Sequence, residues 1–477
     1  MEQTNLIELI QSLKPKEKDQ ILQFASLAFF NNGRMKAQVF PLLELCLSHK
    51  WDDPQQRLKK KEVFFFLFPN QEYVEGKVEK VMVEAHKVIR AFLLTQNYFQ
   101  EENGFHQDFD FSEIVRKRGF IIRHQQLIKK LQKIQEESPW QNRTYFHRQF
   151  LLEYAVYEQE CLQNQTRGDL NVPNALEALE MHCQLNRLTL INHFLVQQKA
   201  ANVSIQEPIK TILYENSVPK RYLEKSSLLK INYEIFSMLK REYVEPSDVR
   251  SLYDLLLMHE KDLDQESLRK FYAYLRNLCV LVSNIFLDNE EIRVTLFDLY
   301  QDNLERGYLH FEGKLHPSTY LAVSLTAVRV KEVEWAIGFI EKYKDEIMGD
   351  NDQQDIYHFN KALYLFGMGR FSDCLDNIPF TSPFVDYLLI GKRLELKSLY
   401  ELQSELLSYK LDAFKMFLSR TSPKLLSNTQ KQLNVDFANL LTQISTSIKG
   451  DQKRADRVIS RIQGKKQSAE WRWLLEK

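Results

Sequence analysis

Residues 317–340 read PSTYLAVSLTAVRVKEVEWAIGFI, and this stretch decides the fold. Tyr320 and Ser324 lie four residues apart, and the apolar residues around them keep the three- and four-residue spacing of one helix face. After a short polar break, Ala336 and Ile340 repeat that spacing. Because Ser324 and Ala336 are small, two helices carrying them are able to approach closely. The stretch therefore predicts an antiparallel helix hairpin.

Two further stretches downstream have similar spacing, and each begins with a residue whose side chain is a ring, at positions 358 and 387. The three starts, at 320, 358 and 387, are 38 and 29 residues apart. Small side chains recur where paired helices would touch, and a glycine marks one turn between helices. The structural repeat positions that this pattern predicts are Tyr320, Ser324, Ala336, Ala362, Gly369, Phe371, Cys374 and Gly391.

On these residues, the stretch 319–420 resembles a degenerate tetratricopeptide array. The resemblance implies a tetratricopeptide-like α-solenoid, built of stacked antiparallel helix hairpins, in the C-terminal part. Residues 9–17, 61–69 and 470–477 also resemble segments of a group of uncharacterised bacterial proteins with tetratricopeptide-like C-terminal halves. What the resemblance implies is a cytoplasmic helical-repeat protein, with no catalytic residue and no cofactor to transfer.

The composition of the whole chain agrees with an all-α fold. Its 477 residues include only 14 Gly and 13 Pro, where average usage would give roughly 57 together. With 44% hydrophobic residues the chain is able to bury a large core, but it lacks the turn residues that many short strands need. The 64 basic and 64 acidic side chains balance, so no strong field favours nucleic acid or an acidic membrane as a partner.

The sequence predicts a cytoplasmic protein without a membrane span. The first residues have no basic region followed by a long apolar one, as a secretory signal would. The longest apolar run, at 63–68, is far shorter than the roughly 18 residues of a spanning helix. The cysteines form no Cys-x-x-Cys pair, and we expect all of them to be buried small hydrophobes, namely Cys46, Cys161, Cys183, Cys279 and Cys374.

Three regions are predicted along the chain: an N-terminal helical module at 1–103, a middle helical-hairpin region at 104–316, and the tetratricopeptide-like region at 317–477. The boundaries are placed in expected loops at 101–110 and 307–317. Helical periodicity predicts the N-terminal and middle helices at 6–13, 16–30, 36–47, 56–68, 74–97, 111–137, 140–164, 173–200, 223–241, 247–259, 267–287 and 291–306.

In the predicted helix 173–200, we expect one buried stripe and a polar face away from it. The stripe contains Leu176, Leu179, Cys183, Leu190 and Phe194. The polar side chains expected away from this stripe are Glu177, Gln184 and Asn192. Leu185 and Leu188 also lie outside the stripe, which is what a helix packed between two neighbours in a stack would show.

The function that the sequence favours is a non-enzymatic scaffold or regulator, which binds a peptide or helix of a protein partner on a solenoid surface. The first alternative is a DNA-binding regulator. Its helix-turn-helix would consist of a helix after Arg57, a turn at 69–72 and a second helix with Lys77, Lys80, Lys87 and Arg90. Interleaved Glu75, Glu79 and Glu84 and the zero net charge argue against it.

The second alternative is an enzyme of unknown class. No glycine-rich phosphate loop, metal-ligand spacing or nucleophile motif supports this alternative, and no small-molecule substrate is evident. His182 and His193 form the densest histidine group, but three helical turns, roughly 16 Å, separate them. We therefore expect them to be core or interfacial histidines.

The C-terminal tail, 449–477, contains nine basic and four acidic residues. Arg454, Arg457, Arg461 and Lys465 share one helical face beside an apolar face of Val458, Ile459 and Ile462, so a basic amphipathic helix is predicted. It serves either as the capping helix of a solenoid, which we favour, or as a surface for an acidic partner or a membrane. In the last segment we expect Trp471, Leu474 and Leu475 to face inward.

Overall fold

The computed structural model describes residues 4–49, 51, 58–163, 170–201, 218–286, 289–349, 352–379, 384–422, 425–447, 452–465 and 468–477. It is 78% helical, and 23 α-helices lie in this part of the chain. The strands within the described ranges are β1 (His310–Phe311) and β2 (Lys314–Leu315), which pair antiparallel. The all-α prediction is confirmed.

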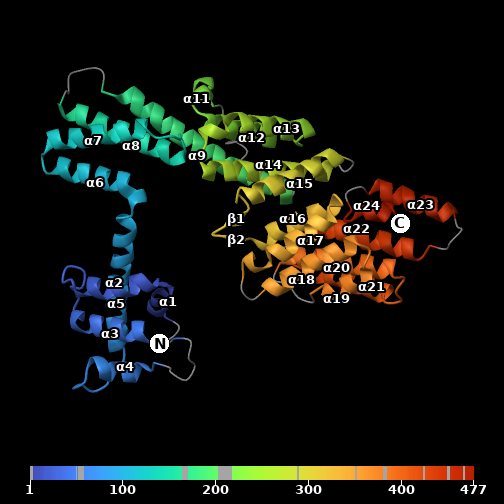
Figure 1. Ribbon diagram of the computed structural model, residues 1–477, viewed down its shortest axis with the longest axis horizontal. Helices are drawn as coiled ribbons and strands as arrows, with labels where there is room; N and C mark the ends of the chain where they lie inside the picture. Colours follow the sequence, from blue (N-terminus) through green and yellow to red (C-terminus); the bar gives the residue numbers. More distant parts are fainter. Residues whose placement is uncertain are drawn as a thin grey trace. The chain divides into compact units, whose positions relative to one another are not determined.

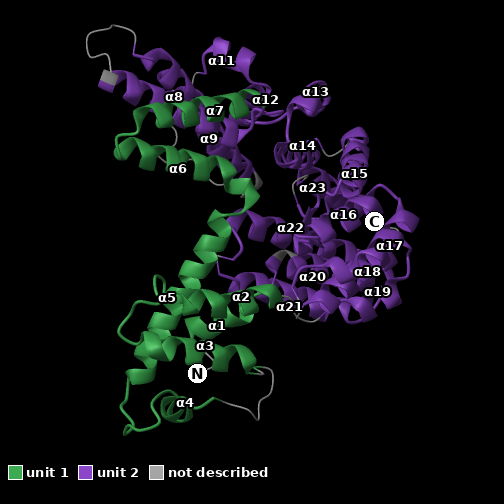
Figure 2. Ribbon diagram, turned by 60° about the vertical axis from the view of Figure 1, so that its left-hand side comes forward, with its two compact units in different colours: residues 1–137 green, residues 138–477 purple. Residues whose placement is uncertain are grey.

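The chain divides into two compact units, Met1–Glu137 and Ser138–Lys477 (Figure 2). This division by contacts does not address whether the three predicted regions fold separately, so that partition stays a prediction. The helices of the first unit are α1 (Asn5–Ser12), α2 (Pro15–Ser26), α3 (Lys36–Ser48), α4 (Lys60–Leu67), α5 (Lys77–Tyr98), η1 (Glu101–Asn103), α6 (Gly104–Lys117) and α7 (Ile121–Glu136).

In the first unit, α1 to α4 all pack on the long helix α5 (Figure 1). Their core contains fully buried side chains from each element, among them Ile7, Ile21, Leu43, Phe64 and Ile89. The apolar run of α4 is thus divided: Phe64 and Leu67 are buried, and the two phenylalanines between them are exposed. The apolar run therefore contributes to the core on one side of α4 and leaves two exposed rings on the other.

Two sequence predictions in this unit are wrong. The expected loop 101–110 is helical, since η1 leads directly into α6. The expected single helix 111–137 is two helices, because the chain turns at Gly119, whose φ of +84° belongs to the left-handed region that glycine adopts without strain. Helical periodicity continued across this turn and concealed it.

The second unit begins with helices that form its larger core. They are α8 (Arg143–Gln163), α9 (Val172–Ala201), α11 (Lys220–Lys225), α12 (Ser227–Lys240), α13 (Pro246–His259), η2 (Glu260–Asp262), α14 (Gln265–Ile285) and α15 (Glu290–Glu305). The strands β1 and β2 follow as a short hairpin. The expected helix 223–241 is interrupted at Ser226, whose hydroxyl accepts a hydrogen bond from the backbone N–H of Leu229 and caps α12.

The remaining helices follow this hairpin. They are α16 (Pro317–Arg329), α17 (Val333–Lys342), η3 (Lys344–Glu346), α18 (Gln353–Gly367), α19 (Phe371–Asn377), α20 (Val385–Glu401), α21 (Leu407–Arg420), α22 (Asn428–Ser445), α23 (Gln452–Gly464) and α24 (Trp471–Leu475). From α11 onward each α-helix contacts the next one along the chain. In addition α16 contacts α18, α18 contacts α20, and α22 contacts α24, so alternate helices also lie side by side (Figure 1).

The buried face of α9 is not the one expected from the sequence. Leu176, Cys183 and Leu190 are exposed, whereas Leu185 and Leu188 are buried. Asn192, expected on the polar face, is fully buried and donates a hydrogen bond of 2.8 Å from its side-chain amide to the carbonyl of Asn232. Because α9 packs on both α8 and α12, its buried surface is set by two neighbours, and a buried amide with a partner is tolerated there.

Candidate functional site

The predicted repeat positions lie in the interior of the second unit. Tyr320, Ser324, Ala336, Ala362 and Cys374 are fully buried. The Tyr320 hydroxyl donates to the carbonyl of Ile340 over 2.6 Å and so joins α16 to α17.

The three other repeat positions also have packing roles. Gly369 has a φ of +73° between α18 and α19, and Phe371 packs on Phe366. Gly391 is buried, and a Cβ there would lie 3.1 Å from the Phe359 ring. These residues hold helices together, so a binding surface must use other side chains.

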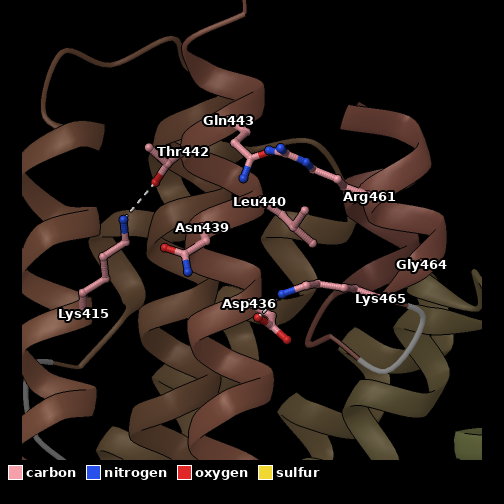
Figure 3. A pocket seen from close by; sticks show the side chains of 9 residues that line it. All are labelled: Lys415, Asp436, Asn439, Leu440, Thr442, Gln443, Arg461, Gly464 and Lys465. Atoms are coloured by element: carbon pink, nitrogen blue, oxygen red, sulfur yellow. Dashed lines mark hydrogen bonds and ion pairs between the residues drawn. The ribbon is translucent and has the colours of Figure 1, made fainter. Parts of the chain in front are cut away.

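A polar groove lies between α21, α22 and α23, near the C-terminal end of the chain (Figure 3). Its volume is about 640 Å³. Basic side chains enter it from α21 and from the α23 end, and α22 supplies the floor with Asn439 near the centre (Figure 3). The lining residues are Lys415, Asp436, Asn439, Leu440, Thr442, Gln443, Arg461, Gly464 and Lys465.

Each cation of the groove has a different kind of partner. Lys465 forms an ion pair of 2.5 Å with Asp436. Lys415 donates to the hydroxyl of Thr442 over 3.2 Å, and Arg461 donates to the side-chain carbonyl of Gln443 over 2.9 Å. Within the described ranges, neither Lys415 nor Arg461 has a carboxylate partner, so two of the three positive charges are not neutralised.

The position of α23 follows from its apolar face. Val458 and Ile462 are buried against the C-terminal core, whereas Ile459, expected to share that face, is exposed. Arg461 and Lys465 of the predicted basic face contact α22, and Arg454 contacts Thr446, which follows that helix, whereas Arg457 is exposed and does not line the groove. The C-terminal end of the basic face thus forms one wall of the groove.

The last segment packs on the same core and supports α23. Trp471 is buried, and its indole N–H donates to the carbonyl of Ile462 over 2.8 Å. Leu474 is only 1% exposed, as predicted, but Leu475 is 41% exposed, so the prediction that Leu475 faces inward is wrong. Adjacent residues point about 100° apart around a helix, and in α24 the buried side is the one that Trp471 and Leu474 share.

A second groove, of about 310 Å³, lies among α18, α19, α20 and α21 and includes the repeat position Gly391. Lys410 pairs there with Glu395 over 2.6 Å, and Lys392 lies over the Phe417 ring. Two further acids, Asp352 and Asp355, also line this groove, so it lacks the excess of positive charge of the groove of Figure 3.

The helix-turn-helix alternative meets a different geometry from the one expected. Residues 68–76 separate α4 from α5, which is longer than the three- to four-residue turn of that motif. Glu75 precedes α5, Glu79 pairs with Lys60, and Glu84 accepts a hydrogen bond from the backbone N–H of Met35. Arg57, the start of the predicted motif, lies outside the described residues.

The two singled-out histidines have separate surroundings. His193 is exposed and contacts Gln197, contrary to the expected core or interfacial position. His182 is half-buried, and its ring lies 5.1 Å from the ring of His147. Burial, together with His147 and Arg143, lowers the pKa of His182. The sequence did not suggest this pairing, because residues 147 and 182 lie on different helices.

Sequence reasoning found the cations of α23 but missed the other walls of the groove. Lys415, Asp436 and Gln443 lie on helices with ordinary amphipathic patterns, and no local motif marks them. The only available signal was the unusual density of basic residues in the tail. The basic residues of the tail form a site only because α23 packs against α22 in the folded chain.

Comparison with family models, with curated proteins and with solved structures finds no match for this chain. In the part of the chain that the structure describes, no helix has both the length and the apolar character needed to cross a bilayer.

Proposed function

We propose that this chain is a non-enzymatic scaffold or regulator, and that it binds an acidic segment of a protein partner in the groove of Figure 3. The observation that carries the proposal is the charge of the groove. Lys415, Arg461 and Lys465 line it against the single carboxylate of Asp436. A carboxylate of a partner would supply the acceptor that Lys415 and Arg461 lack.

The kind of contact in the groove suits a displaceable partner. Lys415 and Arg461 now donate to a neutral hydroxyl and a neutral amide. A carboxylate acceptor adds the attraction between opposite charges to each of these hydrogen bonds, so a partner's Asp or Glu would gain two ion pairs. Arg461 is exposed and Lys415 half-buried, so neither loses all of its hydration when a partner binds.

The succession of helix contacts supports the solenoid part of the proposal. Contacts between neighbouring helices, and between the alternate helices α16, α18 and α20, are those expected of stacked hairpins. In this interpretation α23 and α24 cap the stack, while Arg461 and Lys465, at the C-terminal end of the basic face, bind the partner. The two roles that the sequence suggested for the tail are then compatible.

The proposal is tested by affinity capture from the chain's own cells with three tagged forms. These are the wild type, the groove variant Lys415→Gln/Arg461→Gln, and the control Lys453→Gln/Arg457→Gln, which removes the same charge from exposed positions of α23. We expect a protein with an acidic segment to be retained by wild type and control and lost by the groove variant. Equal retention by all three would reject the groove.

One observation favours the DNA-binding alternative enough to include it as a second candidate. Lys80, Lys87 and Arg90 are all exposed on α5, whereas the acidic Glu79 and Glu84 of the same helix are engaged elsewhere. This face would contact phosphates with little repulsion. A salt-dependent mobility shift of generic duplex DNA, abolished by Lys87→Gln/Arg90→Gln, would favour this candidate over the scaffold.

A further inference from the structure

One face of α20 carries three charged side chains at intervals of four residues: Arg393, Lys397 and Glu401. This spacing aligns them in a single stripe along the helix. All three are largely covered, since their side chains are 13%, 10% and 17% exposed. Residues of the last segment, 468–477, contact all three, while Asn434 of α22 also contacts Arg393 and Phe366 of α18 also contacts Lys397.

The last segment contacts this stripe in order along its length. The Glu470 carboxylate accepts from Arg393 over 3.1 Å and from Lys397 over 2.7 Å. Farther along, the Trp473 indole N–H donates to Glu401 over 3.1 Å, and Lys477 pairs with Glu401 over 2.5 Å. The positive end of the stripe thus meets an acid, and its negative end meets a base.

Aromatic side chains also contribute to the contact between the stripe and the last segment. The ammonium of Lys397 lies over the Phe366 ring at 4.6 Å and over the Trp473 ring at 5.9 Å. Trp473 also packs edge-to-face on Tyr400, with ring centroids 5.4 Å apart. The stripe therefore recognises an aromatic side chain as well as two charges.

A cap needs only to cover apolar surface, but this contact buries charge. A buried ion pair adds little net stability, because removing both ions from water costs about as much as their attraction returns. What such a pair supplies is specificity for one register. Glu470, which makes these contacts, has a φ of +54°, a left-handed backbone conformation that is costly for residues other than glycine.

The stripe also carries more positive charge than Glu470 neutralises. Arg329, exposed at the end of α16, lies within electrostatic range of both Glu470 and Arg393. Three cations therefore surround one carboxylate. This excess favours any acid that competes for the same place.

We propose that the Arg393–Lys397–Glu401 stripe is a peptide-binding surface, and that residues 468–477 occupy it as an intramolecular ligand. The partner that it fits is a short segment with a glutamate, an aromatic residue three positions later and a lysine or arginine four positions after that. This is the order of Glu470, Trp473 and Lys477. Such a partner displaces the tail, and this surface is separate from the groove of Figure 3.

The experiment uses a fluorescent peptide with the sequence of residues 468–477, SAEWRWLLEK, and the full-length protein. In the wild type the tethered tail competes with the peptide, which raises the apparent Kd by the inverse of the open fraction. Glu470→Gln weakens the tail and leaves the stripe intact. By fluorescence anisotropy we expect this variant to bind the peptide at least about tenfold more tightly than wild type.

Three controls make the result specific. Glu476→Gln removes the same charge from an exposed position of the same segment, and we expect it to bind the peptide as weakly as the wild type. A peptide with glutamine in place of its glutamate, and the double variant Arg393→Gln/Glu470→Gln, should each lose the binding. Lys477→Gln is a milder opening variant in case Glu470→Gln does not fold.

Equal peptide affinity of wild type, Glu470→Gln and Lys477→Gln, with the variants folded by circular dichroism, would overturn the proposal and leave the tail a cap. Equal affinity for the peptide and for its variant with glutamine in place of the glutamate would overturn the proposal too. Lys415→Gln/Arg461→Gln should not change the peptide affinity of Glu470→Gln. Failure of the groove proposal and failure of this one are therefore distinguishable.

Discussion

The two adjacent leucines of α24 allow a direct test of which side chains stabilise the C-terminal core. Leu474 is 1% exposed and Leu475 is 41% exposed, so the same substitution removes core packing at one position and mostly surface at the other. Leu→Ala at a buried site costs about 2 to 5 kcal/mol, through lost transfer free energy and the cavity left behind. At Leu475 we expect less than about 1 kcal/mol.

Because the chain has two units, a single unfolding free energy does not describe it, and a local measurement is needed. Native-state hydrogen exchange, followed by mass spectrometry on peptides from α22 and α24, reports local opening. A loss of about 3 kcal/mol corresponds to roughly 100-fold faster exchange. We expect this acceleration in Leu474→Ala and less than about fivefold in Leu475→Ala. Similar acceleration in both variants, or none in Leu474→Ala, would refute the assigned packing.

Three further predictions concern other parts of the second unit and the cysteines. Burial alone would raise the pKa of Glu470, but Lys397, Arg393 and Arg329 hold it well below its ordinary value, so the unfolded chain takes up this proton first as the pH falls. The stabilisation by the ionised Glu470 carboxylate is present above the ordinary glutamate pKa of about 4.3 and is lost as the pH falls below it. The difference in melting temperature between wild type and Glu470→Gln should therefore shrink between about pH 6 and pH 3. A constant difference would contradict the ion pairs. Burial raises the pKa of Cys46 and Cys279 to about 12 and that of Cys374 to about 11, while Cys183 is exposed. We therefore expect Cys183→Ser to remove the fastest phase of thiol labelling with Ellman's reagent at pH 8. An unchanged fast phase would be inconsistent with these exposures. Gly369→Ala should destabilise its hairpin by about 1 kcal/mol, because its φ is +73°, whereas Gly338→Ala, in α17 with open space around it, should stabilise that helix by about 0.5 to 1 kcal/mol. Native-state hydrogen exchange of peptides from α17, α18 and α19 should change in opposite directions in the two variants, and changes of the same sign would count against these backbone conformations.

The fold class was predictable because helical periodicity recurs in every segment and residues that favour turns are scarce throughout the chain. Local interruptions were less predictable: Gly119 ends α6 within a continuous apolar pattern, and only its left-handed φ reveals the turn. The buried face of α9 was wrong because α8 and α12 both pack on that helix, and the choice among its apolar stripes depends on those neighbours. A buried Asn192, whose side-chain N–H donates to the backbone of Asn232, contradicts any rule that places amides outside.

The candidate sites depend on contacts that sequence spacing does not show. Lys465 meets Asp436 from another helix, and Glu470 meets Arg393 across 77 positions of the chain. The stripe on α20 has a regular four-residue spacing, but charges with that spacing are common on solvated helix faces. What distinguishes it is its burial under the last segment, and burial is a property of the folded chain.

The central claim, that the groove of Figure 3 receives an acidic segment, is tested most directly by placing a photo-crosslinking amino acid at Asn439. This residue is exposed on the floor of the groove, and its side chain lies near those of Lys415 and Lys465 (Figure 3). After irradiation in the chain's own cells, the account predicts one protein crosslinked at residue 439 through a peptide rich in Asp or Glu, and loss of that crosslink in Lys415→Gln/Arg461→Gln. A crosslink to a peptide without acidic residues, or one that survives the loss of both cations, would contradict the claim.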